Sequence, residues 1–412
     1  MSVVCILYAT TTAYDSIRGI LAMAGAEFDR LGHEVKMINI SAPDLADRLN
    51  QLLPRRAETI AIGMSGIGLE MYNDGNLLWD QVQIPFFCWY CDHPSYYITR
   101  HRLESRFVVH AYVFPDHAAF NRDYLHANGA AFATHIGIPD PGFFGSVPSA
   151  QRNGRIVFAK SGWNPDMLEQ SWRKVLPPKL FTILFDAIRA SYGKTCGAFP
   201  QIVLDVAAAH RVYLTPGGNL FNTILTHVDN YTRALRTREV ATVLVDYPVD
   251  FIGGGWADFA PEGKRARFHG AMPFDSLRKG LGTYLAAASL NPNTDLSMHD
   301  RVFFALGAGT VPIFDANGFS RTNLPHLEEF SFGQEPGSIA AAVEAVLANP
   351  SAAQAATRET FTEIYPRFSM RRSMEEIHEI ATMVARPAGE MLPAAPSPEG
   401  VWPPPKQLAM AG

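Results

Sequence analysis

Short apolar runs alternate with amphipathic segments along most of the chain. The first run, Val3–Tyr8, is followed by apolar residues at helical spacing from Ile17 to Leu31, and then by a second run, Val35–Ile40. A strand, a helix and a strand in this order predict a βαβ unit. Because such units build parallel sheets with helices on both faces, we predict a doubly wound α/β protein.

The same alternation continues through the first half and resumes in the second. Further strands are predicted at Thr59–Met64, Ile84–Tyr90, Phe107–Phe114, Ala131–Ile136, Arg155–Ala159, Val249–Ile252, Ala266–His269 and Thr310–Phe314. The segment 137–148 contains three prolines and three glycines, which is typical of a linker between domains. We therefore predict one domain over residues 1–148 and a second over residues 149–386.

Two segments depart from this alternation. Residues 163–232 read as mainly helical and are longer than a standard crossover, so we predict a helical insertion in the second domain. Residues 387–412 are rich in proline and alanine, and we expect this tail to be disordered.

Composition narrows the class of protein. The 412 residues are 47% hydrophobic and 18% charged, and the net charge is -5, which argues against general nucleic-acid binding. We find no apolar run of membrane-spanning length, and Ser2–Ala9 lacks the basic flank of a signal peptide. Four cysteines fit a reducing compartment, so we expect a cytoplasmic protein, with peripheral membrane association left open.

The most informative chemistry lies in a helix predicted just before the run Thr310–Phe314. Ser297 and Asp300 have the spacing of a capping box. His299 and Arg301 fall in the first turn, where an exposed cation opposes the helix dipole by roughly 0.3–1 kcal/mol. One explanation is an external anion, such as a phosphate, bound by the amides and by Arg301. The alternative is that Arg301 pairs with Asp300 or with another carboxylate.

Asp92 and His93 are candidates for acid–base chemistry. They follow the predicted strand Ile84–Tyr90, and open α/β sheets bind ligands at the carboxyl ends of their strands. Either side chain could remove a proton from an acceptor hydroxyl. The alternative is that Asp92 caps the following turn and His93 only packs; we favour a functional role for at least one of them.

Other residues in the second half have two readings each. Trp256 follows three glycines and is either a stacking platform or, more commonly, a core residue. Phe268 and Gly270 end a predicted strand, where glycine would let the backbone approach a planar base. The preceding run of Lys264, Arg265 and Arg267 could attract phosphate, although such runs more often form a solvated face.

No resident cofactor or metal is expected. The first predicted turn, Ala9–Ala13, contains no glycine and so lacks the dinucleotide fingerprint. Cys88 and Cys91 form a CxxC pair, but Cys5 and Cys196 stand alone, so a four-ligand zinc site is not supported.

With these pieces placed, the chain resembles GT-B glycosyltransferases, in particular the spore-maturation-protein (CgeB)-like branch of the group 1 transferases. The segments that carry the resemblance are Asp250–Trp256, Phe268–Gly270 with Met272–Phe274 after it, and Asn291–Gly309 followed by Val311 and Pro312. The last is the most specific, through its core His299–Phe303.

The resemblance implies two Rossmann-like domains that face each other across a cleft, with a nucleotide-sugar bound by the second. It also implies metal-independent transfer, because positive side chains and a helix N-terminus take the place of a metal on the diphosphate. The donor-binding residues predicted in this way are Trp256, Phe268, Gly270, Asn293, Ser297, His299, Asp300 and Arg301. The group 1 pattern has a glutamate pair around this helix; here Asp300 is near the first position and Gly307 or Ala308 near the second, which leaves the stereochemical outcome open.

The predicted function is transfer of a sugar from a nucleotide-sugar to a hydroxyl of a glycan, a lipid-linked sugar or a protein, with no nucleic-acid partner. Asp92 or His93 would be the base if the reaction inverts the anomeric centre. Two alternatives keep the fold: a nucleotide-sugar epimerase or hydrolase that needs no acceptor, and a non-catalytic nucleotide-sugar-binding module.

Overall fold

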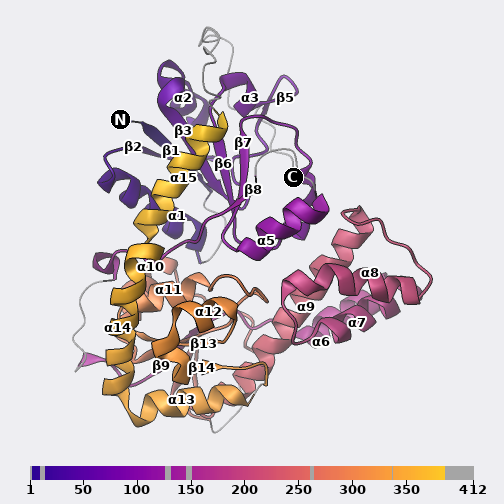
Figure 1. Cartoon of the computed structure of the whole chain (residues 1–412), viewed down its shortest axis with the longest axis vertical. Coiled ribbons are helices and arrows are strands. Elements are labelled where there is room, and N and C mark those ends of the chain that lie inside the picture. The colour runs from indigo at the N-terminus through magenta and orange to yellow at the C-terminus, as the bar shows by residue number, and fades with distance from the viewer. Residues whose placement is uncertain are drawn as a thin grey trace. The chain divides into compact units, whose positions relative to one another are not determined.

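The chain forms two compact α/β units. The computed structural model describes residues 2–9, 14–125, 131–144, 151–259, 264–335 and 337–385. Unit 1 comprises the described residues up to Gly137 together with those from Met370 to Ala385, and unit 2 lies within Ile138–Ser369 (Figure 1). Each unit contains a six-stranded sheet in which every strand pairing is parallel. The prediction of two Rossmann-like α/β domains is therefore confirmed.

The sheet of unit 1 has the strand order β2-β1-β3-β6-β7-β8. Its strands are β1 Val3–Tyr8, β2 Glu34–Asn39, β3 Thr59–Met64, β6 Phe86–Tyr90, β7 Val108–Tyr112 and β8 Ala131–Ala133. The order of the first five strands is that of flavodoxin-like sheets. The central strands β3, β6 and β7 are buried along their whole length, as expected for parallel strands covered on both faces.

Short helices connect these strands. They are α1 Ser16–Arg30, α2 Leu45–Asn50, α3 Leu78–Val82, α4 Ile98–His101 and α5 Pro115–Phe120. Short 3₁₀-helices occur at Leu53–Glu58 and Pro94–Tyr97, and a π-helical turn occurs at Asn121–Leu125.

A small antiparallel hairpin in unit 1 was not predicted. It pairs β4 Tyr72–Asn73 with β5 Asn76–Leu77. The two residues between them, Asp74 and Gly75, both have positive φ angles, of 48° and 77°. An Asp-Gly pair with two positive φ angles is the usual two-residue hairpin turn, so the dipeptide was a readable signal.

The last described helix, α15 Met370–Ala385, belongs to unit 1 and not to the second domain, where the sequence prediction placed it (Figure 1). Its buried residues Met370, Met374, Ile377 and Ala381 form one face. That face packs against α1 and contacts β3 and β6. The division between the units also falls at 137/138, earlier than the predicted boundary at 148/149. The predicted disordered tail lies outside the described residues.

The sheet of unit 2 has the strand order β11-β10-β9-β12-β13-β14. Its strands are β9 Ile156–Ala159, β10 Val249–Ile252, β11 Arg267–His269, β12 Ala286–Ser289, β13 Val311–Asp315 and β14 Ser331–Phe332. Numbered within the unit, the order is 3-2-1-4-5-6, the dinucleotide-binding topology. The direction of winding reverses between β9 and β12, and ligands bind such sheets at the carboxyl ends of the strands at this switch point.

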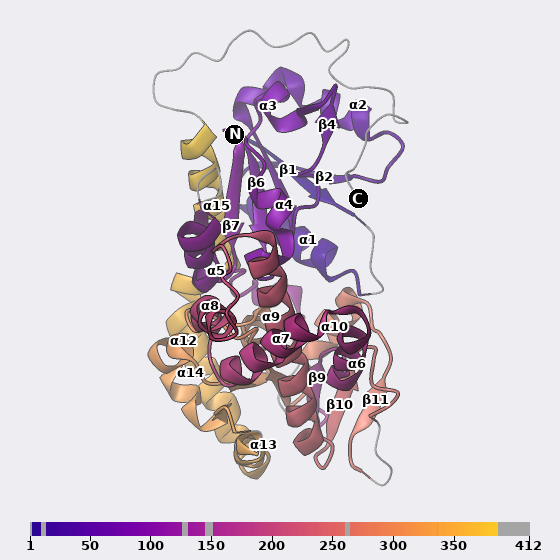
Figure 2. The same ribbon diagram turned by 90° about the vertical axis from the view of Figure 1, so that its right-hand side faces the viewer.

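Helices surround this sheet and continue into the insertion. They are α6 Pro165–Val175, α7 Pro178–Ser191, α8 Phe199–Ala209, α9 Asn219–Leu244, α10 Phe274–Leu281, α11 Asp300–Gly307, α12 Gly318–Asn323, α13 Ser338–Ala348 and α14 Pro350–Phe368. The helices α6, α7 and α8 come between β9 and β10 and pack against α9 (Figure 2). The predicted helical insertion is therefore present. Its last helix runs on without a glycine or proline to Leu244 and serves as the crossover.

Candidate functional site

The helix α11 starts later than its predicted cap. His299 is the N-cap residue, and Ser297 is fully buried in the preceding loop, where its carbonyl accepts a hydrogen bond of 2.8 Å from Asn317 Nδ2. The predicted capping box of Ser297 and Asp300 is therefore wrong. The predicted end of the helix is confirmed, because Gly309 has a φ of 64° and its amide bonds the carbonyl of Leu306 at 3.0 Å.

Three consecutive side chains form a hydrogen-bonded chain at this helix start. Arg301 Nη1 lies 3.1 Å from His299 Nε2, and His299 Nδ1 contacts Asp300 Oδ1. A guanidinium can only donate, so His299 Nε2 accepts and the imidazole proton is on Nδ1, from which it donates to Asp300. The Asp300 carboxylate also accepts the backbone N–H of Arg301, at 3.0 Å. Asp300 thereby orients His299, and His299 orients Arg301.

The charge states of these groups follow from their surroundings. Burial, and then the positive charge of Arg301, lower the pKa of His299 to about 4, although Asp300 acts against them. Burial alone would raise the pKa of Asp300, but His299 and then Arg301 outweigh it and lower the value to about 2. At neutral pH the imidazole is therefore neutral and the carboxylate is ionised.

Arg301 keeps its positive charge without a carboxylate partner. Among the described residues, no carboxylate oxygen lies within the 4.0 Å of an ion pair from its guanidinium. Burial lowers the pKa of Arg301. The charge of Asp300 raises this pKa, and the charge of Arg233 on α9 lowers it further. The sequence left two explanations open for a cation at this helix start. The structure does not support the explanation in which Arg301 forms an ion pair with an acidic side chain.

Lys160 adds a second cation at the switch point. It directly follows β9, and its ammonium group makes no hydrogen bond or ion pair with any part of the chain that the structure describes. Burial lowers the pKa of Lys160 well below its ordinary value, and the nearby charges of Arg233 and Arg301 lower it further. Asp315 and Asp229 act in the opposite direction but do not restore it. Lys160, Arg233 of α9 and Arg301 of α11 are thus near enough for their charges to interact, and Arg233 is also paired with Asp229 at 3.3 Å.

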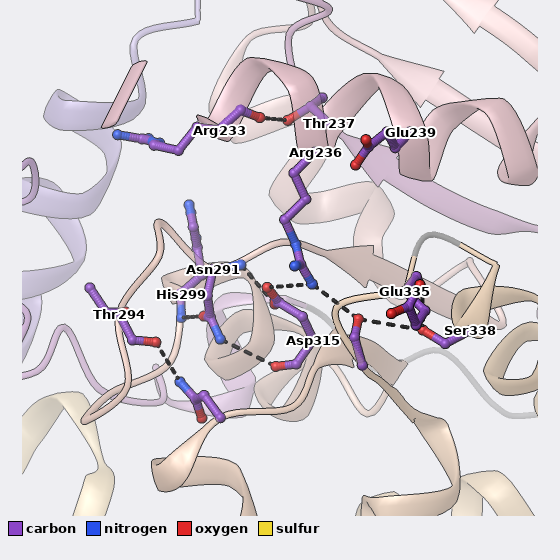
Figure 3. A network of polar contacts seen from close by, with 12 residues as sticks. Arg233, Arg236, Thr237, Glu239, Asn291, Thr294, His299, Asp315, Glu335 and Ser338 are labelled. Atoms are coloured by element: carbon purple, nitrogen blue, oxygen red, sulfur yellow. Dashed lines mark hydrogen bonds and ion pairs between the residues drawn. The ribbon is translucent and has the colours of Figure 1, made fainter. Parts of the chain in front are cut away.

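Two asparagines hold the loop between β12 and α11. Asn291 Oδ1 accepts the backbone N–H of His299 at 2.8 Å, and the backbone N–H of Asn291 donates to Asp315 Oδ1 at 2.8 Å (Figure 3). Asn293 has a positive φ of 58°, and its side-chain amide donates to Asp229 at 3.0 Å. The predicted binding residue Asn293 therefore fixes the loop against α9 through its side chain.

The aromatic and glycine candidates lie elsewhere in unit 2. Trp256 is only 4% exposed, packs edge-to-face on Phe251 with ring centroids 5.1 Å apart, and donates from Nε1 to the carbonyl of Lys160 at 2.8 Å. It is a core residue and not a stacking platform. Phe268 is half-buried and stacks on Phe251 at 4.7 Å. Gly270 is exposed, and a Cβ there would meet no heavy atom within 4 Å, so open space lies beside its backbone.

The basic run before β11 is a solvated face. Lys264, Arg265 and Arg267 are all exposed, and Lys264 pairs with Asp246 at 2.5 Å. This was the commoner of the two readings of such a run, and it removes these residues from the candidate site.

Asp92 and His93 belong to unit 1, at the carboxyl end of β6. His93 is 3% exposed, and its Nδ1 lies 2.9 Å from Ser95 Oγ and caps the turn Pro94–Tyr97. Asp92 is half-buried and accepts a hydrogen bond of 3.2 Å from Tyr97 Oη. The structure thus gives the capping role to His93, not to Asp92.

The sequence analysis missed two cations of the cluster, Lys160 and Arg233. Lys160 had a readable signal, because it is a basic residue directly after a predicted strand of the second domain. Arg233 had none, since it lies within a long helix whose orientation on the sheet is a tertiary property.

The described residues contain neither a candidate metal cluster nor a helix that could span a membrane. No group of three or more His, Cys, Asp or Glu side chains is placed there to hold a metal ion. None of the helices in the described ranges combines the length and apolar character needed to cross a bilayer.

Solved structures share this architecture over nearly the whole chain. An α-glucosyltransferase in complex with UDP and a 13-mer DNA is similar with a TM-score of 0.52 and 9% identity, covering 93% of this chain and 100% of the other. The chain has the GT-B fold. The sucrose-phosphate synthase of Thermosynechococcus elongatus is similar with a TM-score of 0.50 and 11% identity, over 92% and 98% of the two chains. No family model matches the sequence, and no curated protein matches it.

Proposed function

We propose that the chain is a glycosyltransferase of the CgeB-like branch, that unit 2 binds the diphosphate of a nucleotide-sugar donor, and that the sugar is transferred to a hydroxyl without a metal. The observation that carries this proposal is the cluster of Lys160, Arg233 and Arg301. These cations come from β9, α9 and α11 and meet at the topological switch point of a 3-2-1-4-5-6 sheet.

A diphosphate explains the charge of this cluster. Like charges close together are unfavourable, and the charges of Arg233 and Arg301 add to burial, the larger cause, in lowering the pKa of Lys160. An anion with several oxygens would relieve that repulsion and would accept hydrogen bonds from both an ammonium and a guanidinium. In transfer from a nucleotide-sugar, negative charge grows on the leaving diphosphate, so the same cations would stabilise the transition state.

The hydrogen-bonded series of Asp300, His299 and Arg301 supports a positioning role for His299 at this site. A neutral imidazole that accepts from Arg301 holds the guanidinium without neutralising it. Gly270, with open space beside its backbone, is our candidate for the residue that borders the base. The similar α-glucosyltransferase was solved with UDP, so we take uridine diphosphate as the first nucleotide to test.

For the acceptor side we propose Asp92 as the base, because His93 is buried and already engaged by Ser95. The proposed acceptors are a glycan, a lipid-linked sugar or a protein. Although DNA is part of that neighbouring complex, the net charge of -5 makes a nucleic-acid acceptor unfavourable here. We also infer a cytoplasmic location, where nucleotide-sugars would be within reach.

A thermal-shift screen tests the donor site. UDP, GDP, ADP, dTDP and CMP are added to the full chain at increasing concentration. A nucleotide at about 100 times its Kd stabilises by about 2.7 kcal/mol, or roughly 5–10 °C for a unit of this size. Failure of all five nucleotides to raise the Tm would contradict the proposal.

The matching UDP-, GDP-, ADP-, dTDP- or CMP-sugars are then incubated with and without acceptor hydroxyls. Transfer requires that product appear only with an acceptor. An epimer or free sugar formed from the donor alone would point instead to an epimerase or hydrolase, and binding without any turnover would point to a non-catalytic module.

A further inference from the structure

A polar pocket of about 320 Å³ opens at the carboxyl ends of β12, β13 and β14, beside the donor site proposed above. Its walls come from the loop after β12, the ends of β13 and β14, the helices α9 and α12, and the segment that follows α7. The charged side chains that line it are three cations, Lys194, Arg236 and Arg321, and two carboxylates, Asp295 and Asp315. The lining therefore carries one positive charge in excess.

Both carboxylates already have partners. Asp315 accepts the backbone N–H of Asn291 at 2.8 Å, and its other oxygen lies 3.5 Å from Arg236 Nη2. Asp295 accepts the backbone N–H of Gly318 at 2.7 Å and lies 3.8 Å from Arg321. The two carboxylates are thus balanced by two of the three cations.

The polar groups left over are mainly donors. Arg236 is 7% exposed, and its Nε–H has no hydrogen-bond partner in the described parts of the chain, while its Nη2 donates to the carbonyl of Gly333 at 3.2 Å (Figure 3). Thr294 is 2% exposed, and its hydroxyl has no partner among those residues either. Lys194 is exposed at the rim and makes no ion pair within the described residues. Buried unsatisfied donors cost about 1–3 kcal/mol each, so the pocket is chemically incomplete as it stands.

We propose that this polar pocket binds a small organic anion through a phosphate or carboxylate group. An oxyanion would interact with the ammonium of Lys194 at the rim and would accept hydrogen bonds from the buried, unsatisfied donors of Arg236 and Thr294. The volume is about 320 Å³, against about 30 Å³ for one water molecule, so a sugar phosphate or a sugar acid fits better than a bare ion.

The site is separate from the diphosphate cluster but shares a wall with it. Asn291 lines the pocket, bonds Asp315 through its backbone, and through its side chain holds the amide of His299 at the start of α11. The two sites have different cations, Arg236 and Lys194 in one and Lys160 and Arg301 in the other, although the charge of Asp315 acts on both Arg236 and Lys160. The inference goes beyond the proposed transferase activity and does not depend on it.

Calorimetric titration of the full chain tests the proposal. The probes are inorganic phosphate, glucose 6-phosphate, gluconate and, as the neutral control, glucose. Lys194→Ala removes the rim charge, and Thr294→Val removes the unsatisfied hydroxyl while keeping the side-chain shape. Lys179→Ala is the matched control, because Lys179 is an exposed lysine of α7 that does not line the pocket. Arg301→Met removes a cation of the other site.

We expect glucose 6-phosphate or gluconate to bind and glucose not to bind. Lys194→Ala should weaken binding of the anion at least tenfold. Thr294→Val should weaken it about fivefold, as expected for the loss of one hydrogen bond. Lys179→Ala and Arg301→Met should bind it as the wild type does, and saturating UDP should not displace it.

Three results would overturn the proposal. They are no binding of any anion to the wild type, wild-type affinity in both pocket variants, and loss of the anion in Arg301→Met or on addition of UDP. The last would mean that the anion occupies the diphosphate cluster. Binding of glucose 6-phosphate alone identifies a phosphate ligand, and binding of gluconate alone identifies a carboxylate ligand. Lys194→Ala should bind UDP as the wild type does. Loss of anion binding in this variant would then concern the polar pocket alone and not the proposed donor site.

Discussion

Replacing Arg301 by methionine is the most direct test of the diphosphate cluster. Methionine keeps much of the side-chain volume and removes the charge. The guanidinium has no carboxylate partner among the described residues, so its removal strands no buried anion. Among the described residues, the guanidinium loses its hydrogen bond to His299 Nε2 and its attraction for the Asp300 carboxylate. The free energy of unfolding should therefore fall by about 1.5–3 kcal/mol, the usual value of a hydrogen bond to a charged group.

The catalytic loss should be much larger. A charged donor placed on developing negative charge contributes about 2.7–4 kcal/mol, or about 100- to 1,000-fold in kcat. His299→Gln should give a smaller loss, because Arg301 keeps its charge and loses only the imidazole that positions it. Added guanidinium ion should restore part of the rate to Arg301→Met and none to His299→Gln if the two residues act as assigned.

The assay measures release of the nucleoside diphosphate from the donor that binds, with kcat and KM determined separately. Arg265→Met is the matched control, since Arg265 is exposed on the same unit and outside the cluster. A folded Arg301→Met protein with kcat within about threefold of the wild type would refute the assignment of Arg301 to the leaving group. Equal losses in both arginine variants would point to a general effect of net charge.

Further predictions concern pH, stability and the acceptor side. Donor binding should weaken as pH rises through the lowered pKa of Lys160, because the neutral amine of Lys160 no longer attracts the diphosphate, and Lys160→Met should bind weakly at every pH. Burial lowers the pKa of His110 from 6.5 to about 4, so unfolding by urea should become easier as pH falls between these values, by up to about 3 kcal/mol; a flat profile would contradict this. Trp256→Ala should cost unit 2 about 3–5 kcal/mol, whereas a loss below 1 kcal/mol would mean that the indole is not a core residue. Asp92→Asn should lower kcat about 100-fold or more without changing UDP affinity, and an unchanged kcat would remove Asp92 as the base.

Most strands and long helices could be predicted because their signal is local. Val3–Tyr8, Thr59–Met64 and Val249–Ile252 are strands with the predicted bounds. The turn residues on either side of an apolar run mark the ends of the strand. Burial of the strand on both faces follows from its place in a parallel sheet. The shortest strands, such as Ser331–Phe332, carry too few residues to show a period.

The candidate site was predictable only in part. The sequence found the segment Asn291–Arg301 and the odd position of a cation at a helix start, because both are features of neighbouring residues. It placed the cap at Ser297 instead of His299, since the choice depends on Asn291, which bonds the amide of His299, and on Asn317, which bonds the carbonyl of Ser297. Those contacts join residues 8 and 20 positions apart.

The sequence by itself thus determined the α/β class, the two sheets, the helical insertion and the segment that contains Arg301. Tertiary structure decided that Lys160, Arg233 and Arg301 meet, that Trp256 fills the core, and that α15 packs on unit 1. The physical reason is the range of the interactions. Periodicity and capping act within a few residues, whereas the neighbours of a charge, and the sheet that an amphipathic helix covers, depend on how distant strands pair.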